Sequence, residues 1–301
     1  MHRTFRYIVV LCAVCIACLG ATASDLDLVR IGIVTDIHAH DADSPFELGG
    51  PKVMVNYAER MHAFVDAMNA WPADVVIELG DLVNGVFVMG PDDLGDPARI
   101  PAILDDAVSI LSTYDGPIHH VIGNHDVYDL SKEEYLAGTG GEQTYYSFDL
   151  GGYHFVVLDA QYNKDGVDYG HVSWMVQGTI PEPELAWLRD DLASTDSPTV
   201  VSIHQPLDAD YTLTAGGPPV WNHLEVRDVL ARSERVIAVF QGHDHDNNYA
   251  LIDGIHYVTF AGMVDHLDPT PPTWAAVTLD PAAQTITIEG AGLQDDLELT
   301  Y

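Results

Sequence analysis

The tetrapeptide Gly123-Asn124-His125-Asp126 follows directly after the apolar run of residues 118–122. An Asn, a His and an Asp side by side at the end of a buried strand have no role in core packing. Asn and His can ligate a metal or donate to a phosphate, and Asp can orient the His. This stretch therefore indicates a polar site at the end of a strand.

Four further apolar runs end at similar groups of polar side chains. They end at Asp36 with His38, at Asp81 with Asn84, at His204, and at His243 with His245. Sites in α/β sheets lie beyond the carboxyl ends of the strands, so we expect the five groups to meet at one edge. Together they offer oxygen and nitrogen ligands without sulfur, a set that suits Mn, Fe or Zn.

Such a ligand set is compatible with a pair of divalent ions. Two ions about 3.5–4 Å apart can lower the pKa of a bridging water and clamp the phosphoryl oxygens of an in-line displacement. One carboxylate must bridge the two ions, and Asp81 is the natural candidate. Each motif by itself is also compatible with an ordinary turn or strand end. The hypothesis therefore depends on their joint occurrence in one order.

The segments around these groups alternate between strands and helices. Apolar and β-branched runs predict strands over 29–35, 75–79, 118–122, 199–203 and 236–240. Helical spacing predicts helices over 52–71, 100–114, 184–194 and 222–233, with a helical turn over 131–137. Hairpins are expected over 145–158, 249–260 and 275–289, and long surface loops over 162–183 and 208–219. Parallel βα units followed by hairpins predict one mixed α/β domain.

The first 23 residues have the pattern of a signal peptide. Arg3 and Arg6 precede an apolar run over 7–19, and residues 21–23 form an A-x-A cleavage site. We expect a leader over 1–23, a catalytic domain over 24–301, and export to the periplasm or the medium. An uncleaved anchor is one alternative, although the run is shorter than a membrane span of about 20 residues. A lipid attached at Cys18 is another.

The composition excludes several function classes. All three cysteines lie within the predicted leader, so the mature chain would have neither disulfides nor thiolate ligands or nucleophiles. The 12 Lys and Arg residues face 46 Asp and Glu, which gives a formal net charge of −34. Such a charge argues against nucleic acid or an anionic membrane surface as a partner. It is consistent with solubility or with a saline medium.

The motifs DIH, GDLVN, GNHD, SIHQP and GHDH, in this order, resemble those of the calcineurin-like metallophosphoesterases. This resemblance implies a four-layer α/β/β/α sandwich of two mixed β-sheets, with the metal site at the carboxyl ends of the strands. It implies one divalent ion held by Asp36, His38, Asp81 and His245, and another held by Asp81, Asn124, His204 and His243. It also implies that His125 acts near the leaving oxygen as a proton donor or transition-state stabiliser, oriented by Asp126.

A narrower resemblance extends beyond the motifs. Residues 56–71 and the stretches HHVIGNHDVY, FVVLDA, PELAWLRDDL and GHDHDNNY are similar to the manganese-dependent ADP-ribose/CDP-alcohol diphosphatases. That group typically hydrolyses nucleotide pyrophosphate linkages, but it has Gln at the position of His38, so its metal and substrate do not transfer directly. Asn84 stands where the purple acid phosphatases have a tyrosine, which argues against that subgroup.

We therefore expect an exported dinuclear-metal phosphohydrolase that acts on a small phosphorylated or nucleotide-like substrate. It would cleave a phosphodiester or nucleotide pyrophosphate bond through a metal-bridging hydroxide. Few basic residues lie near the motifs, so the metals rather than Lys or Arg would hold the phosphate. Tyr128, Trp174 and Trp221 are candidates for stacking on a base or sugar, with local packing as the alternative. A phosphomonoesterase and a non-catalytic scaffold are the competing functions.

Overall fold

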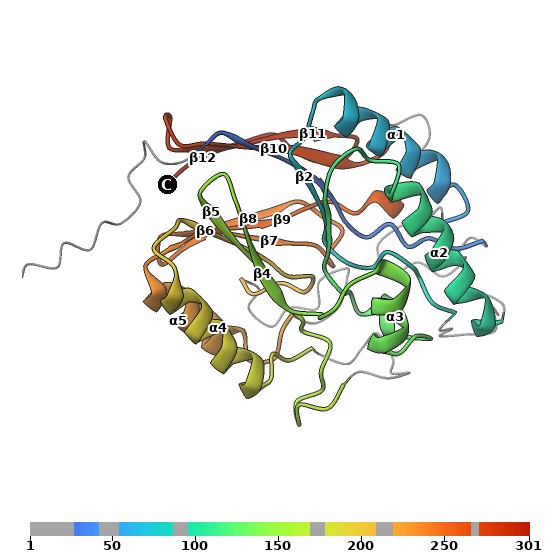
Figure 1. The fold of residues 1–301 in the computed structure, drawn as a ribbon, viewed down its shortest axis with the longest axis horizontal. Coiled ribbons are helices and arrows are strands. Elements are labelled where there is room, and N and C mark those ends of the chain that lie inside the picture. The colour runs from blue at the N-terminus through green and yellow to red at the C-terminus, as the bar shows by residue number, and fades with distance from the viewer. Residues whose placement is uncertain (1–26, 42–53, 87–95, 169–177, 209–218, 266–270) are drawn as a thin grey trace, which may run out of the picture.

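Two six-stranded sheets pack face to face in the computed structural model, and helices cover their outer faces (Figure 1). The structure describes residues 27–41, 54–86, 96–168, 178–208, 219–265 and 271–301. The layers therefore follow one another as helix, sheet, sheet and helix, which confirms the predicted four-layer α/β/β/α sandwich. The predicted leader, Trp174 and much of the two predicted long loops lie outside the described residues.

The first sheet has the strand order β12-β11-β10-β1-β2-β3. Its strands are β1 (Val29–Val34), β2 (Val75–Glu78), β3 (Ile118–His120), β10 (Trp274–Asp280), β11 (Thr285–Ala291) and β12 (Leu297–Thr300). β1, β2 and β3 run parallel, as helical crossovers require. β10, β11 and β12 join β1 as an antiparallel meander. The sheet is therefore mixed, and its parallel half carries the first three motifs.

The second sheet has the strand order β4-β5-β6-β7-β9-β8. Its strands are β4 (Tyr146–Leu150), β5 (Tyr153–Val157), β6 (Thr199–Ser202), β7 (Val236–Gln241), β8 (Asn248–Ile252) and β9 (Ile255–Thr259). The central four strands are parallel, and two hairpins add the antiparallel edge strands. Both hairpin turns, Gly151-Gly152 and Asp253-Gly254, have positive φ at their two central residues, as two-residue type I′ turns require.

The helices are α1 (Tyr57–Ala70), α2 (Ile100–Leu111), α3 (Lys132–Thr139), α4 (Glu182–Ser194) and α5 (His223–Ser233). α1 and α2 lie over the first sheet, and α4 and α5 lie over the second (Figure 1). α3 begins at a capping box made by Ser131 and Glu134 and ends at the left-handed Gly140. The described residues also include the short 3₁₀ turns η2 (Pro97–Arg99), η3 (His125–Val127) and η4 (Met263–Asp265).

The core lies between the two sheets. Ile31, Ile77, Phe155 and Phe240 meet there, each no more than 1% exposed. β1 and β2 also bury their other faces under α1 and α2, which explains why their sequences are apolar runs rather than alternating patterns. β10 alternates buried and half-buried residues because one of its faces lies in the core and the other is only partly covered by α1.

The structure moves some of the predicted boundaries. The predicted strand over 118–122 ends at His120, although the Val121 N–H still bonds to the Glu78 carbonyl over 2.8 Å. The predicted helix over 52–71 begins only at Tyr57. β12 was not predicted, because only Leu299 of its four residues is buried. Within the described residues, no helix has the length and apolarity needed to cross a membrane.

Candidate metal centre

The predicted ligands lie together at the edge where the parallel strands of both sheets end. Asp36 and His38 follow β1, Asp81 follows β2, His204 follows β6, and His243 and His245 follow β7. Asn124 lies between Gly123, which packs against Gly80, and His125, whose N–H donates to Asp81 Oδ1 over 2.7 Å. Both sheets therefore contribute ligands to a single centre beyond the carboxyl ends of their strands, where sites in α/β proteins are expected.

The backbone of this centre is strained. Asp36, His38, Asp81, His243 and His245 all adopt positive φ values between 47° and 71°. This left-handed region is costly for residues other than glycine, and such strain concentrates at functional sites. The conformation changes the backbone direction locally beyond the strand ends, and we infer that it allows these side chains to gather.

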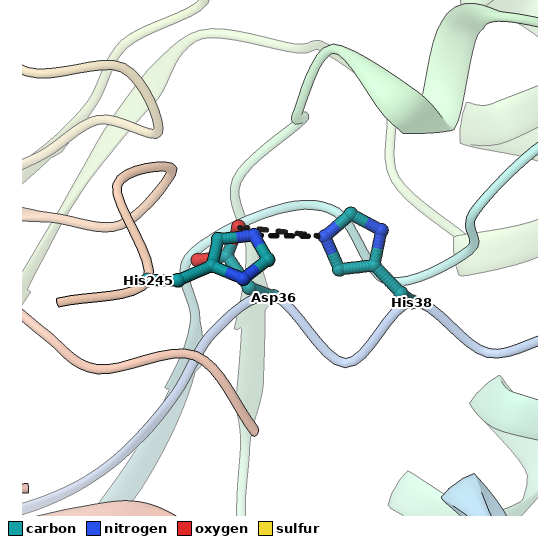
Figure 2. Close-up of side chains that lie close together, drawn as sticks. All are labelled: Asp36, His38 and His245. Atoms are coloured by element: carbon teal, nitrogen blue, oxygen red, sulfur yellow. Dashed lines mark hydrogen bonds and ion pairs between the residues drawn. The ribbon is translucent and has the colours of Figure 1, made fainter. Parts of the chain in front are cut away.

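The first group of ligands is formed by Asp36, His38 and His245 (Figure 2). His245 Nε2 lies 3.2 Å from Asp36 Oδ1 and 3.2 Å from His38 Nε2. His38 Nε2 lies 3.7 Å from Asp36 Oδ1. Two imidazole nitrogens and one carboxylate oxygen therefore point at a common centre, which is the arrangement of a cation site.

The second group is formed by Asp81, His204 and His243. His204 Nε2 lies 3.2 Å from Asp81 Oδ2, and its ring centroid lies 5.1 Å from that of His243. Asp81 Oδ2 is also 3.6 Å from His38 Nε2, which belongs to the first group. The Asp81 carboxylate thus lies between the two groups, where a bridging ligand would have to be.

The buried polar atoms of the centre fit a pair of cations. Within the described residues, Asp36 Oδ1, Asn124 Oδ1, His204 Nε2 and His243 Nε2 are buried without a hydrogen-bond partner. Leaving such atoms unpaired in a protein interior costs about 1–3 kcal/mol each, and more for a charged group. Lone pairs from oxygen and imidazole nitrogen without sulfur suit Mn, Fe or Zn. The donor set therefore fits divalent ions of this kind.

Three of the histidines are fixed through their other ring nitrogen. His38 Nδ1 bonds to Asn84 Oδ1 over 2.8 Å, and His204 Nδ1 bonds to the Leu79 carbonyl over 2.8 Å. His245 Nδ1 bonds to Asp265 Oδ2 over 2.6 Å. Because each of these acceptors takes the Nδ1 proton, each Nε2 is left with its lone pair for a metal.

The electrostatics of the centre couple its carboxylates to its histidines. Burial alone would raise the pKa of Asp36, but His245 and His204 hold it well below its usual range. Burial would also raise the pKa of Asp81, but the positive charges of His204 and His125 lower it below its usual value. Burial lowers the pKa of His204, but Asp81 and Asp36 outweigh it and raise the value to about 10. The geometry therefore keeps ionised carboxylates beside positive charge, and a bound cation would supply that charge in place of the His204 Nε2 proton.

Two motif glycines are required by close approach to these carboxylates. A Cβ at Gly123 would collide with the backbone nitrogen and the carboxylate of Asp81. A Cβ at Gly242 would collide with Thr35 and lie 2.8 Å from Asp36 Oδ2. The glycines of the GNHD and GHDH motifs thus allow one strand end to pack directly against another.

His125 lies at the rim of the centre, with its side chain 18% exposed. Its Nε2 is 4.0 Å from Asp81 Oδ2, and its Nδ1 bonds to the Asn84 carbonyl over 2.8 Å. Since a carbonyl oxygen can only accept, the proton of this bond belongs to Nδ1. His125 is therefore placed beside the ligands with Nε2 directed away from that bond.

The hydrogen bonds of Asp126 differ from those that its predicted role, orienting His125, requires. Its Oδ2 accepts the N–H groups of Asp81 and Gly123 over 3.0 and 2.8 Å, and its Oδ1 accepts that of Val83 over 3.0 Å. It is fully buried and ties the GDLVN loop to the GNHD loop. The orienting role predicted for Asp126 falls instead to the Asn84 carbonyl, because both Asp126 oxygens are used by the backbone.

Sequence reasoning did not identify Asn84 and Asp265 as partners of the ligating histidines. Asn84 belongs to the GDLVN motif, which is a signal for its proximity, but its pairing with His38 spans 46 residues. Asp265 lies in η4 outside any motif. Of the aromatic candidates, Tyr128 is 4% exposed with its ring 4.4 Å from that of His125, whereas Trp221 is 51% exposed.

This chain is similar in sequence to a known protein family and to named relatives. A family model described as calcineurin-like phosphoesterase matches residues 29–247. The manganese-dependent ADP-ribose/CDP-alcohol diphosphatase of Oryza sativa subsp. japonica is 24% identical to this chain, in an alignment that covers 91% of this chain and 94% of that one. The protein of the same name from Xenopus tropicalis is 24% identical, in an alignment that covers 90% of this chain and 93% of that one.

Solved structures share the fold. A dimetal phosphatase from Danio rerio superposes with a TM-score of 0.75 at 20% identity and covers 91% of this chain and 99% of that one. GAP50, the anchor in the inner membrane complex of Plasmodium, superposes with a TM-score of 0.56 at 14% identity, with 91% and 89% covered. At these identities the likeness concerns the arrangement of the sheets and helices.

Proposed function

This chain belongs to the calcineurin-like phosphoesterase family and is a metal-dependent phosphohydrolase, and we propose that it cleaves the diphosphate linkage of a small nucleotide compound. The proposed substrates are molecules such as ADP-ribose or a CDP-alcohol, with Mn²⁺ as the working metal. Support comes from the relatives, whose names specify both this substrate class and manganese and which align with nearly the whole chain. A phosphodiester of similar size is the wider substrate class.

We assign one ion to Asp36, His38, Asp81 and His245, and the other to Asp81, Asn124, His204 and His243. The observation that carries this assignment is the convergence of unpaired buried atoms from both sheets on one centre. When bound, two such ions polarise the phosphoryl group and lower the pKa of water. Asp81 Oδ2 lies 3.6 Å from His38 Nε2 and 3.2 Å from His204 Nε2, and these distances to both ligand groups support a bridging role for the carboxylate.

The protein side chains bind and orient the reacting groups. The strained turns after β1, β2 and β7 hold the ligands before a substrate arrives, so little reorganisation is needed during the reaction. His125 is the one partly exposed histidine of the centre and can hold a proton at Nε2 for the leaving oxygen. Its Nδ1 bond to Asn84 fixes the ring for that transfer.

We also propose that residues 1–23 are a cleaved leader and that the protein is exported. The positive start, the apolar run and the A-x-A site support this assignment. The mass of the protein recovered from cell fractions tests it. A periplasmic or secreted product that begins at Ser24 is expected, and a full-length product in the cytoplasm would contradict export.

A substrate panel tests the proposed function. The purified protein is reconstituted with Mn²⁺ and assayed on ADP-ribose, CDP-choline, bis-p-nitrophenyl phosphate and p-nitrophenyl phosphate. A kcat/KM higher by several factors of ten for the first two supports the nucleotide diphosphatase. Preference for the diester would place the substrate among simple phosphodiesters, and preference for the monoester would favour a phosphomonoesterase. No hydrolysis of any of the four would favour a non-catalytic scaffold.

A further inference from the structure

Asn124 differs from the other assigned ligands because its amide has two unlike ends. Oδ1 is buried and unpaired within the part of the chain that the structure describes, whereas Nδ2 donates to the Tyr128 hydroxyl over 3.1 Å. An amide oxygen can ligate a divalent ion, but an amide NH₂ group presents only donor hydrogens to it. The second ion therefore depends on which end of this side chain faces the centre.

Tyr128 is held firmly in the position where it meets Asn124. It directly follows η3, and its N–H bonds to the His125 carbonyl over 3.2 Å. Its side chain is buried and packs against Gly85, where an added Cβ would lie 2.8 Å from the Tyr128 Cβ. The Tyr128 hydroxyl oxygen is thus held in a fixed position, where it accepts from Asn124 Nδ2.

The Tyr128 ring also supports His125. The two ring centroids are 4.4 Å apart at an angle of 48°, and the His125 ring also contacts the His38 ring, with centroids 4.5 Å apart. A buried ring in this position is unsuited to stacking on a nucleotide base. Local packing is therefore the role that the structure supports for this aromatic residue.

We propose that Tyr128 is a positioning residue that sets the orientation of the Asn124 amide. Its hydroxyl accepts from Nδ2, which turns Oδ1 towards the ion shared by Asp81, His204 and His243. Without that acceptor the amide is free to rotate by half a turn and to present its NH₂ group to the cation. The inference rests on the dinuclear centre proposed above.

The first test is Mn²⁺ binding by the Tyr128→Phe variant, which keeps the ring and removes the acceptor. Isothermal titration should show one of the two ions bound about 10–100-fold more weakly, the usual cost of losing a partner of a metal ligand. Turnover should recover as the Mn²⁺ concentration is raised. Tyr153→Phe is the matched control, because Tyr153 is a buried tyrosine whose hydroxyl bonds to that of Tyr301 over 2.6 Å. Its Mn²⁺ affinity should equal that of the wild type.

The second test separates amide orientation from general loosening of the loop. Asn124→Asp replaces the amide by a carboxylate, either oxygen of which can ligate. In that background Tyr128→Phe should change Mn²⁺ affinity by less than about threefold, so the two substitutions should be strongly coupled. Equal losses in both backgrounds, or wild-type Mn²⁺ affinity in Tyr128→Phe, would overturn the role of Tyr128. A wild-type protein that binds fewer than two Mn²⁺ ions would instead overturn the dinuclear centre, and the role of Tyr128 with it.

Discussion

The Asp265 carboxylate lies 2.6 Å from Nδ1 of His245, whose Nε2 lies 3.2 Å from Asp36. His38 and His204 are held by neutral acceptors, an amide oxygen and a backbone carbonyl. Among these three histidines, only His245 therefore has a negative charge behind it. Because a carboxylate partner makes imidazole a more basic ligand, the two halves of the centre are electrostatically unequal.

Removing the negative charge of Asp265 should weaken the binding of one ion and not of the other. Asp265→Asn keeps the size of the side chain and is expected to lower the affinity for one of two Mn²⁺ ions about 10–100-fold. Isothermal titration measures the effect. Asp253→Asn, at an exposed hairpin turn that asparagine tolerates, serves as the control and should not change Mn²⁺ binding. Unchanged affinity in Asp265→Asn would show that the bond does not contribute to metal binding.

Replacing His125 should separate catalysis from metal binding. His125→Ala is expected to reduce kcat about 10²–10⁴-fold, the usual contribution of a proton donor, while both ions remain bound. Steady-state kinetics and metal analysis of the same sample provide the two readouts. His62→Ala, on the exposed face of α1, is the control and should keep full turnover. If both ions were lost with His125, its role would be structural.

The motif residues could be predicted from sequence because their signals are local. The strands before most of these groups are buried on both faces and are visible as short apolar runs, as with β1 and β7. β3, which precedes the GNHD motif, is only half-buried. Gly123 and Gly242 stand beside the ligands because no Cβ fits there. Sequence alone therefore indicated which residues would meet at the sheet edge.

The supporting contacts could not be predicted in the same way. Asn84 meets His38 across 46 positions and Asp265 meets His245 across 20. Such pairs depend on how two sheets and their loops pack, and neither periodicity nor turn chemistry encodes that packing. The role of Asp126 was mistaken for the same reason, because its neighbour in sequence, His125, turns its ring towards Asn84. β12 was missed because it has too few buried residues for a pattern.

A histidine far from the metal centre should make stability depend on pH. Burial alone would lower the pKa of His154, but Asp191 and Asp149 raise it above its usual value of about 6.5. Its ring bonds to Asp149 over 2.8 Å and to Asp191 over 2.9 Å. Asp149 is 77% exposed and therefore screened by solvent, so Asp191 is the main partner.

The raised pKa sets the direction of the effect. The folded state binds the His154 proton more tightly than the unfolded state, so the contribution is fully present below about pH 6.5. It is lost as the pH rises through the folded-state pKa. Urea unfolding of the wild type and His154→Gln should give a difference in free energy that is largest at low pH. A difference that grew with pH would contradict this assignment.

The most direct test of the dinuclear centre is the metal content and turnover of Asp81→Ala, compared with the wild type and with Asp190→Ala on the exposed face of α4. Asp81 Oδ2 lies near histidines of both ligand groups, so its loss should remove both ions and abolish hydrolysis. The wild type and Asp190→Ala should each retain two ions and full activity. Full turnover by Asp81→Ala after its metals are gone would contradict the mechanism.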